Sequence, residues 1–494
     1  MKNKYLVRII KNELQYFKNV EFGEIKYMNY GSVMKDAKLA KSDIVGIYGQ
    51  NGSGKTAMVE ALDILKCVLA GEKIPYDQYA GLLDEKNVTK ITTDFFMEHE
   101  ENKYKIKYEL MLQADHEEKR INLTSEKLTY WTRGATWKQE RELLFSNPYY
   151  DTESILENTN IQVVSNHIKY FENATFIKSL QNLAVYCAQN GVSLFFNRLL
   201  LKDQKIKTED KEEKKLYEVI QGLNEFARLY LQVIKVSQLG SINENSVIPL
   251  NFHCESESRI MQGCLPLVMN GQGEIPEVIF HQLQSAIDAI NIALKAIIPD
   301  LSIELTSLGE ELDKDGTKII QVKVYSVRDG HKFLTKYESE GIKRIISLLN
   351  NLISLYNYPG ICLVVDELDS GIFEYLLGEL LGVLNEEAKG QLIFTSHNLR
   401  AFEELSNKNI ICSTVNPQNR YIRLVGVEKN HNFRDYYIRT LLLGGQKEEL
   451  YDEMKLESLG FAFRKACRNN EPVTVPFSKK FQEKLNKKTD DFKN

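Results

Sequence analysis

The sequence has no apolar run that approaches the roughly 20 residues needed to cross a bilayer. Its first residues, MKNKYLVRIIKNELQYF, also lack the apolar core and the cleavage site of a secretory signal peptide. We therefore expect a cytoplasmic protein that has no membrane partner.

Cysteine is scattered along the chain, with seven residues and no CxxC pair. A zinc knuckle, a zinc hook and a CxxC redox motif are therefore not predicted. His253 and Cys254, with Cys264 ten residues later, are a candidate for a partial metal site. Ordinary polar and core roles explain these residues better, and we interpret the cysteines as buried thiols.

An excess of basic residues is also missing, because the net charge is −5. This net charge argues against a protein whose whole surface is basic, although a protein with this net charge can still have a local basic groove. The hydrophobic fraction of 43% and the charged fraction of 27% are typical of a folded protein. A length of 494 residues exceeds the roughly 250–300 residues that one core supports, so we expect at least two lobes.

A glycine-rich stretch, GQNGSGKT, fits the phosphate-loop pattern G-x-x-x-x-G-K-[ST] at every fixed position. Glycines let backbone N–H groups curl around phosphate oxygens, and the start of a helix adds partial positive charge. We expect Lys55 to reach the β and γ phosphates and the Thr56 hydroxyl to bind Mg²⁺. The predicted nucleotide-binding residues of this loop are Gly49, Gln50, Asn51, Gly52, Ser53, Gly54, Lys55 and Thr56.

The residues on both sides of this loop predict the strand and the helix that a phosphate loop needs. Before it, DIVGIY is a short run suited to a buried strand. After it, apolar residues recur on one helical face up to Gly71, which suits a helix C-terminus. These apolar residues are Met58, Leu62, Leu65 and Leu69.

A second apolar run, residues 361–365, ends in two adjacent carboxylates. It resembles a Walker B motif, in which Asp366 holds Mg²⁺ through water and Glu367 polarises the attacking water. Further along, GQLIFTSHNL is another strand-like run, and it ends in His397, from where an imidazole can contact the γ phosphate. Each of these signals is weak alone, so their order and their neighbours decide the interpretation.

Between the two halves, YESEGIKRIISLLNNLISLY places Ser339 and Gly341 directly before an amphipathic helix. An ordinary helix with Ser339 as its N-cap is one interpretation. The other is an ABC-type signature motif, in which the serine hydroxyl and the helix N-terminus bind an anion and Lys343 and Arg344 add positive charge. The order of the glycine-rich phosphate loop (Walker A), signature, Walker B and histidine favours the second interpretation.

Together these motifs resemble the ABC-type ATPase heads of the SMC, Rad50 and OLD-like group over residues 1–120 and 301–445. Within them, SEGIKR, DELDSGIF and NFRDYY resemble the stand-alone AAA ATPases of bacterial anti-phage systems, such as the ATPase subunit of PARIS. The resemblance implies ATP and Mg²⁺ as cofactors and catalytic roles for Glu367 and His397. Relatives often carry a histidine where this chain has Phe373, so we assign no catalytic role there.

The expected fold is an α/β, P-loop ABC-type ATPase head that is split by a mainly helical insertion and carries an antiparallel β element in its first lobe. That element is predicted by the alternating stretches TKITTDFFMEHEENKYKIKYELMLQ and INLTSEKLTYW. The expected domains are an N-terminal ATPase lobe, a β element followed by the helical insertion, a C-terminal ATPase lobe, and a helical piece with a lysine-rich tail. They cover residues 1–120, 121–300, 301–445 and 446–494.

The resemblance implies an ATP-binding and ATP-hydrolysing switch that senses a phage product and controls a separate effector, such as a TOPRIM-type nuclease. Only 97 residues follow His397, so we do not expect a fused nuclease domain. The alternative is a DNA-repair or DNA-loading ATPase, and the sequence leaves open whether the protein binds nucleic acid. We expect at least a homodimer, with room for a larger assembly, because a signature motif acts on the nucleotide of another copy.

Overall fold

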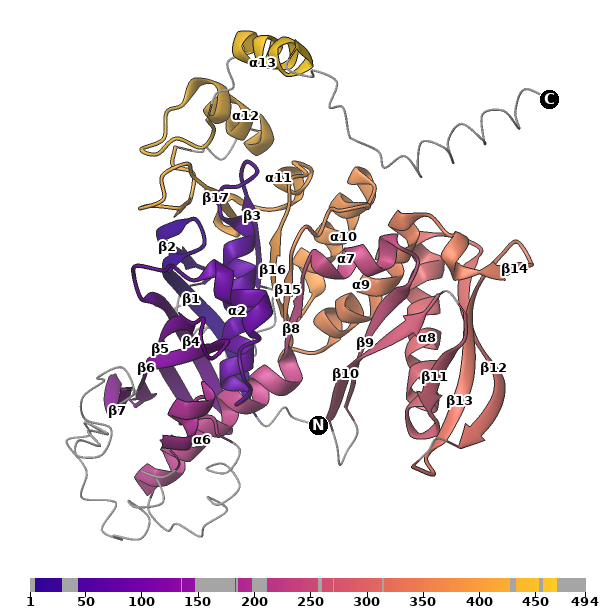
Figure 1. Cartoon of the computed structure of the whole chain (residues 1–494), viewed down its shortest axis with the longest axis horizontal. Coiled ribbons are helices and arrows are strands. Elements are labelled where there is room, and N and C mark those ends of the chain that lie inside the picture. Colours follow the sequence, from indigo (N-terminus) through magenta and orange to yellow (C-terminus); the bar gives the residue numbers. More distant parts are fainter. Residues whose placement is uncertain are drawn as a thin grey trace, which may run out of the picture. The chain divides into compact units, whose positions relative to one another are not determined.

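The computed structural model describes residues 5–28, 43–134, 136–146, 183, 185–197, 211–255, 260–269, 271–312, 315–426, 432–452 and 456–468. These residues divide into two compact units, Met1–Leu450 and Tyr451–Asn494 (Figure 1). Within the described residues, no helix is both long enough and apolar enough to span a membrane.

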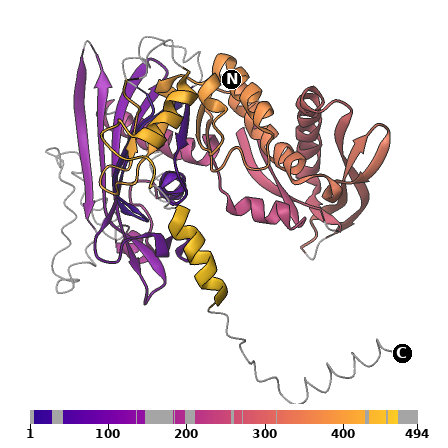
Figure 2. The same ribbon diagram turned by 90° about the horizontal axis from the view of Figure 1, so that it is seen from above.

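An antiparallel sheet of six strands forms the first layer, in the order β2-β1-β4-β5-β6-β7. Figure 2 shows its strands side by side as one layer. Its strands are β1 (Leu6–Phe17), β2 (Val20–Lys26), β4 (Thr89–His99), β5 (Asn102–Asp115), β6 (Arg120–Arg133) and β7 (Trp137–Ser146). Burial alternates along β5, as expected for a strand with one face toward the core. The predicted antiparallel element is confirmed.

A second sheet, in the order β18-β17-β3-β16-β15-β8, carries the nucleotide motifs. Its inner strands pair in parallel, and they are almost continuously apolar, as is usual for strands that are covered on both faces. The strands are β3 (Asp43–Tyr48), β8 (Leu231–Ile234), β15 (Cys362–Val365), β16 (Gln391–Thr395), β17 (Ile410–Ser413) and β18 (Tyr421–Ile422).

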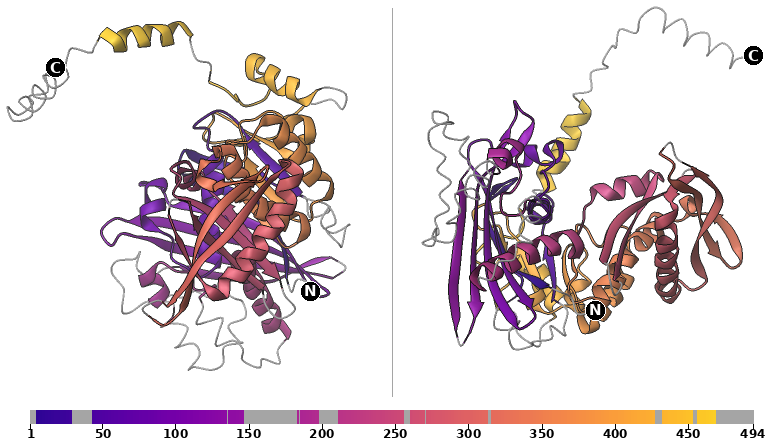
Figure 3. Two further views of the ribbon diagram at one scale, coloured as in Figure 1. Left: turned by 90° about the vertical axis from the view of Figure 1, so that its right-hand side faces the viewer. Right: turned by 90° about the horizontal axis from the view of Figure 1, so that it is seen from below.

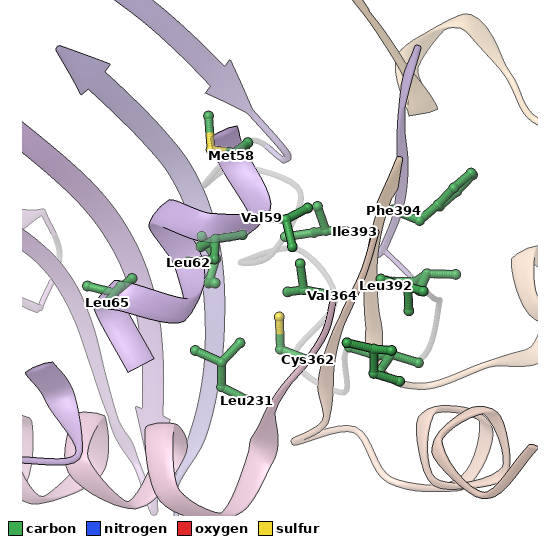
Figure 4. Packing of buried hydrophobic residues seen from close by; sticks show 14 of the residues in the cluster. Met58, Val59, Leu62, Leu65, Leu231, Cys362, Val364, Leu392, Ile393 and Phe394 are labelled. Carbon is green, nitrogen blue, oxygen red and sulfur yellow. The ribbon is translucent and has the colours of Figure 1, made fainter. Parts of the chain in front are cut away.

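Helix α2 (Lys55–Leu69) contacts both sheets. The four apolar residues predicted for its inner face are all buried, and Gly71 follows the helix with a φ of 70°, which an L-residue rarely adopts. In Figure 4, Val59 and Leu62 on this helix face Val364 and Ile393 on the parallel sheet. This packing fixes the helix whose first residue is Lys55.

Two polar contacts tie the antiparallel sheet to the parallel sheet. Gln391 on β16 accepts a hydrogen bond from the Ile9 backbone N–H at 3.0 Å and donates one to the Ile9 carbonyl at 2.8 Å. The buried guanidinium of Arg8 pairs with Asp43 at 3.2 Å and donates to the Lys389 carbonyl at 2.7 Å. Because all of these groups are largely withdrawn from water, losing one partner would leave a costly unpaired group.

The middle of the chain forms a smaller α/β portion. A hairpin of β9 and β10 lies beside helix α9, while β11, β13 and β12 form an antiparallel sheet with β14 added to β13. Figure 3 shows helix α8 alongside β12 and β13. The bounds are β9 (Val247–Glu255), β10 (Ile260–Val268), β11 (Gly273–Pro276), β12 (Leu301–Leu312), β13 (Lys318–Arg328), β14 (His331–Leu334), α7 (Ser237–Asn243), α8 (Glu277–Ile297) and α9 (Glu340–Asn357).

Residues 121–300 were expected to hold a β element followed by a mainly helical insertion, and the described part of this range contains short strands among its helices. Helix α6 (Lys211–Glu225) and a π-helical turn (Phe226–Tyr230) are present, but the next residues, LQVI, form β8 in the parallel sheet. Strands β9 to β11 also fall within this range, and β11 pairs with β13 across the expected boundary at residue 301. Short apolar runs do not distinguish a strand from a helix by periodicity, which accounts for the difference.

The remaining elements of the first unit are α3 (Tyr76–Tyr79), η1 (Ala80–Leu82), η5 (Thr335–Tyr337), α10 (Glu374–Glu387), α11 (Ala401–Glu404), η6 (Asn407–Asn409) and α12 (Phe433–Leu443). The second unit contains helix α13 (Leu456–Arg468). The lysine-rich tail that the sequence predicts lies outside the described residues.

Candidate functional site

The glycine-rich loop joins β3 to α2 in the conformation that its glycines allow. Gly49, Gly52 and Gly54 have φ values of 154°, 77° and 88°, which L side chains rarely adopt. A Cβ at Gly49 would also lie 2.0 Å from the Ser413 hydroxyl. The Lys55 ammonium donates to the carbonyls of Gly49 and Gln50 at 2.9 and 2.8 Å, so it is folded back over the loop.

A cavity of about 180 Å³ lies over this loop and brings together both halves of the sequence signal. The carboxyl ends of β15 and β16 reach it from the C-terminal part of the chain, as expected for a ligand site in a parallel sheet. Its lining residues are Lys18, Asn19, Asn51, Gly52, Gly54, Lys55, Thr56, Ala57, Glu367, Thr395 and His397.

Asp366 is the buried acid of the site, with an exposure of 1%. Its Oδ1 accepts hydrogen bonds from the hydroxyls of Thr395 at 2.5 Å and Thr56 at 3.3 Å. Its Oδ2 is buried and has no hydrogen-bond partner among the described residues. A carboxylate oxygen left open beside a threonine hydroxyl fits the oxygen ligands that Mg²⁺ prefers.

The protein alone does not offer a complete metal cage. Among the described residues, no group of three or more His, Cys, Asp or Glu side chains is placed to hold a metal ion. A cation at Asp366 and Thr56 would therefore need oxygens from phosphate or water, as is usual for Mg²⁺ at nucleotide sites. The side chains of His253 and Cys254 lie outside the described part of the chain.

Glu367 and His397 border the same cavity. Glu367 has a φ of 47°, and its backbone N–H donates to the Thr395 hydroxyl at 2.8 Å, so the turn after β15 is fixed by the end of β16. The backbone N–H of His397 donates to Asp369 at 3.1 Å. Desolvation lowers the pKa of His397, and the nearby Lys55 ammonium lowers it further, so the neutral imidazole is favoured.

Burial also lowers the pKa of Lys55, while the carboxylates of Asp366 and Glu367 oppose that change. The ammonium is thus held in a partly desolvated position close to two acids. Such a position makes its attraction to a phosphate stronger than it would be in bulk water.

The residues of the predicted signature motif are not among those that line this cavity. Ser339 is the N-cap of α9, where its hydroxyl accepts from the Ile342 N–H at 3.3 Å, and it is exposed and not among the residues described as lining the cavity. Gly341 packs against the turn after β15, because a Cβ there would lie 2.3 Å from the Gly371 carbonyl. Lys343 is buried and donates to Asn245, so the structure does not bring its ammonium to the cavity.

Several residues at the site were not predicted from the sequence. Lys18 and Asn19 reach the cavity from the turn between β1 and β2, far from any motif. The sequence could have predicted Thr395 as a site residue, because it is a polar residue at the end of a strand-like run and lies two residues before His397. Arg344, in contrast, was predicted to add positive charge, and it is buried and donates to the Asp366 carbonyl at 3.5 Å.

The AAA ATPase domain family has a model that matches residues 23–400 of this chain. The chain belongs to the AAA ATPase domain family. An SMC head domain from Pyrococcus furiosus, bound to the C-terminal domain of ScpA, is 12% identical, with a TM-score of 0.36 over 85% of this chain and 96% of that chain.

Two further solved structures resemble this AAA ATPase domain protein. The SMC head domain from Thermotoga maritima is 13% identical, covering 84% of this chain and 99% of that chain with a TM-score of 0.32. The recombination mediator protein RecF with ATPrS is 13% identical, covering 85% and 99% with a TM-score of 0.34. Comparison with curated proteins gives no match.

Proposed function

We propose that this AAA ATPase domain protein binds ATP with Mg²⁺ and hydrolyses it to ADP and phosphate. The observation that carries the proposal is the open Oδ2 of Asp366, buried beside the Thr56 hydroxyl at the cavity that Lys55 also lines. Asp366 and Thr56 would hold the metal ion, which when bound neutralises charge on the phosphate oxygens. Lys55 would leave the loop carbonyls for the β and γ phosphates.

Glu367 is the proposed general base of the reaction. Its carboxylate borders the cavity, while its backbone is fixed by Thr395. A base held in this way can accept a proton from a water molecule that attacks the γ phosphate. His397 would contact the γ phosphate as a neutral imidazole that donates one hydrogen bond.

We also propose that the active unit is at least a homodimer. Ser339 is exposed and lies away from the cavity of its own chain, so it would complete a site only on a second copy. Two residues before it in the chain, Tyr337 is 70% exposed, and Phe373 after the turn that follows β15 is 74% exposed. Aromatic side chains are enriched at protein–protein interfaces, so these two exposed aromatic residues suit an interface that includes Ser339. Two such contacts close by a two-fold axis.

In the cell, the proposed role is a switch in bacterial anti-phage defence that controls a separate effector nuclease, such as a TOPRIM-type enzyme, after a phage product is sensed. The support is the resemblance of SEGIKR, DELDSGIF and NFRDYY to stand-alone defence ATPases such as the ATPase subunit of PARIS. Nucleotide-dependent assembly would let the effector read the ATP state of the switch.

The test combines phosphate release with a measurement of mass. The wild type should hydrolyse ATP, and Glu367→Gln should bind ATP, hydrolyse it slowly and accumulate as a dimer in light scattering. Glu277→Gln is the matched control, because this acid begins α8 outside the cavity and is far in the chain from Ser339 and Phe373. A wild type that releases no phosphate contradicts the proposal. Salt-sensitive binding of DNA at physiological ionic strength would instead support the DNA-acting alternative.

A further inference from the structure

An ion pair stands at the edge of the nucleotide cavity and has no role in the hydrolysis described above. The Lys18 ammonium lies 2.9 Å from a carboxylate oxygen of Glu60. Lys18 lines the cavity from the turn between β1 and β2. Glu60 lies on α2, one helical turn after Thr56 and on the same face of that helix.

The backbone of Lys18 is held firmly while its side chain reaches into water. Tyr16 and Lys18 have φ values of 52° and 57°, a region that non-glycine residues occupy only when the surroundings enforce it. The Lys18 N–H donates to the Leu82 carbonyl at 2.7 Å, and the Asn19 carbonyl accepts from Arg420 at 2.5 Å. The Lys18 side chain itself is 37% exposed, so it can change partners without moving the turn.

The charges around the ion pair favour the transfer of the Lys18 ammonium from Glu60 to another anion. Lys18 and Lys55 are the two ammonium groups among the described residues that line the cavity. Burial raises the pKa of Glu60, the Lys18 ammonium opposes this, and Asp366 raises it further. Glu60 is therefore a half-desolvated acid that competes with an incoming polyphosphate for the same cation. A triphosphate carries more negative charge than one carboxylate, and it attracts the ammonium more strongly.

We propose that Lys18 is a second phosphate-binding cation that Glu60 holds when no nucleotide is bound, and that the ammonium passes from the Glu60 carboxylate to a phosphate oxygen when a nucleoside triphosphate enters. The inference rests on the proposed binding of ATP. Glu60 then acts as a built-in competitor that weakens nucleotide affinity, and the strength of the pair sets the ATP concentration at which the switch responds.

The test is calorimetric titration with Mg²⁺ and ATPγS or ADP. Lys18→Gln should weaken ATPγS binding by about tenfold, because a hydrogen bond to a charged group is lost. Glu60→Gln should tighten binding by about two- to fivefold, because Lys18 is released. Lys11→Gln is the matched control, since Lys11 pairs with Glu24 at 3.1 Å in the same hairpin but does not line the cavity.

The direction in which Glu60→Gln changes the affinity for ATPγS distinguishes this mechanism from an ion pair with a purely structural role. If the pair only pins the hairpin to α2, both single variants weaken binding alike. If Glu60 merely repels phosphate, Glu60→Gln tightens binding equally in the Lys18→Gln background. Either result overturns the inference, as does unchanged affinity in Lys18→Gln.

A folding control keeps the test decisive. Thermal unfolding of each variant is measured first, and if Lys18→Gln does not fold, Lys18→Arg and Glu60→Gln carry the comparison. Wild-type binding that Lys55→Ala removes but Lys18→Gln does not affect overturns this inference alone. A wild type that binds neither nucleotide overturns the proposed function as well.

Discussion

Replacing Gly341 by alanine tests how tightly helix α9 is packed against the turn after β15. The added Cβ would lie 2.3 Å from the Gly371 carbonyl oxygen, so the two backbones must separate by roughly 1 Å to reach ordinary contact. Overpacking of this kind costs about 1–3 kcal/mol, whereas alanine in place of glycine gains at most about 1 kcal/mol in a helix. We expect a net loss of about 1–2 kcal/mol.

Gly382→Ala in α10 is the matched control. A Cβ there would meet the end of the flexible Glu404 side chain at 3.3 Å, so the helical gain of up to about 1 kcal/mol should appear in full. Thermal unfolding should therefore move in opposite directions for the two variants. Gly341→Ala should also lose ATPase activity, because Ser339 at the start of the same helix would be displaced. If it unfolds like Gly382→Ala and keeps wild-type turnover, the packing argument is wrong.

Three further predictions concern the nucleotide site. Lys55→Ala should weaken ATP binding by about 100-fold, because the phosphate charge loses its main partner, and wild-type affinity in a titration would contradict this. Glu367→Gln should slow hydrolysis by about 100- to 10,000-fold while keeping ATP binding, and equal turnover would place the base elsewhere. Mixing Lys55→Ala chains with Ser339→Arg chains should restore partial ATPase activity, since one of the two shared sites carries neither change. No recovery in confirmed heterodimers would refute the shared site.

The sequence predicted those parts of the site whose signal is local. A glycine loop of the phosphate-loop pattern between a strand and an amphipathic helix is a specific signal, and Asp366 is placed by the apolar strand directly before it. The structure accordingly joins Thr56 to Asp366 by one hydrogen bond, 310 positions apart in the chain.

The parts that were missed depend on tertiary packing. Lys18 reaches the cavity because Leu82 and Arg420 hold its turn, and no local pattern reports such contacts. Lys343 lies four residues after Ser339, and the packing of α9 turns its ammonium inward to Asn245, a contact that no local pattern reports either. Strand β8 lies within the range expected to be mainly helical, but the parallel sheet rather than the local sequence determines its conformation.

The strand order of the parallel sheet has a consequence for synthesis on the ribosome. Strand β3 pairs with β16 and β17, whose paired residues are translated roughly 350 and 360 residues later, or about 20–70 s at typical elongation rates. The strands of the antiparallel sheet, in contrast, are nearly consecutive in the chain and all precede residue 147. The nascent chain can therefore complete its antiparallel layer early, while β3 keeps unpaired edges until the last third of the protein emerges.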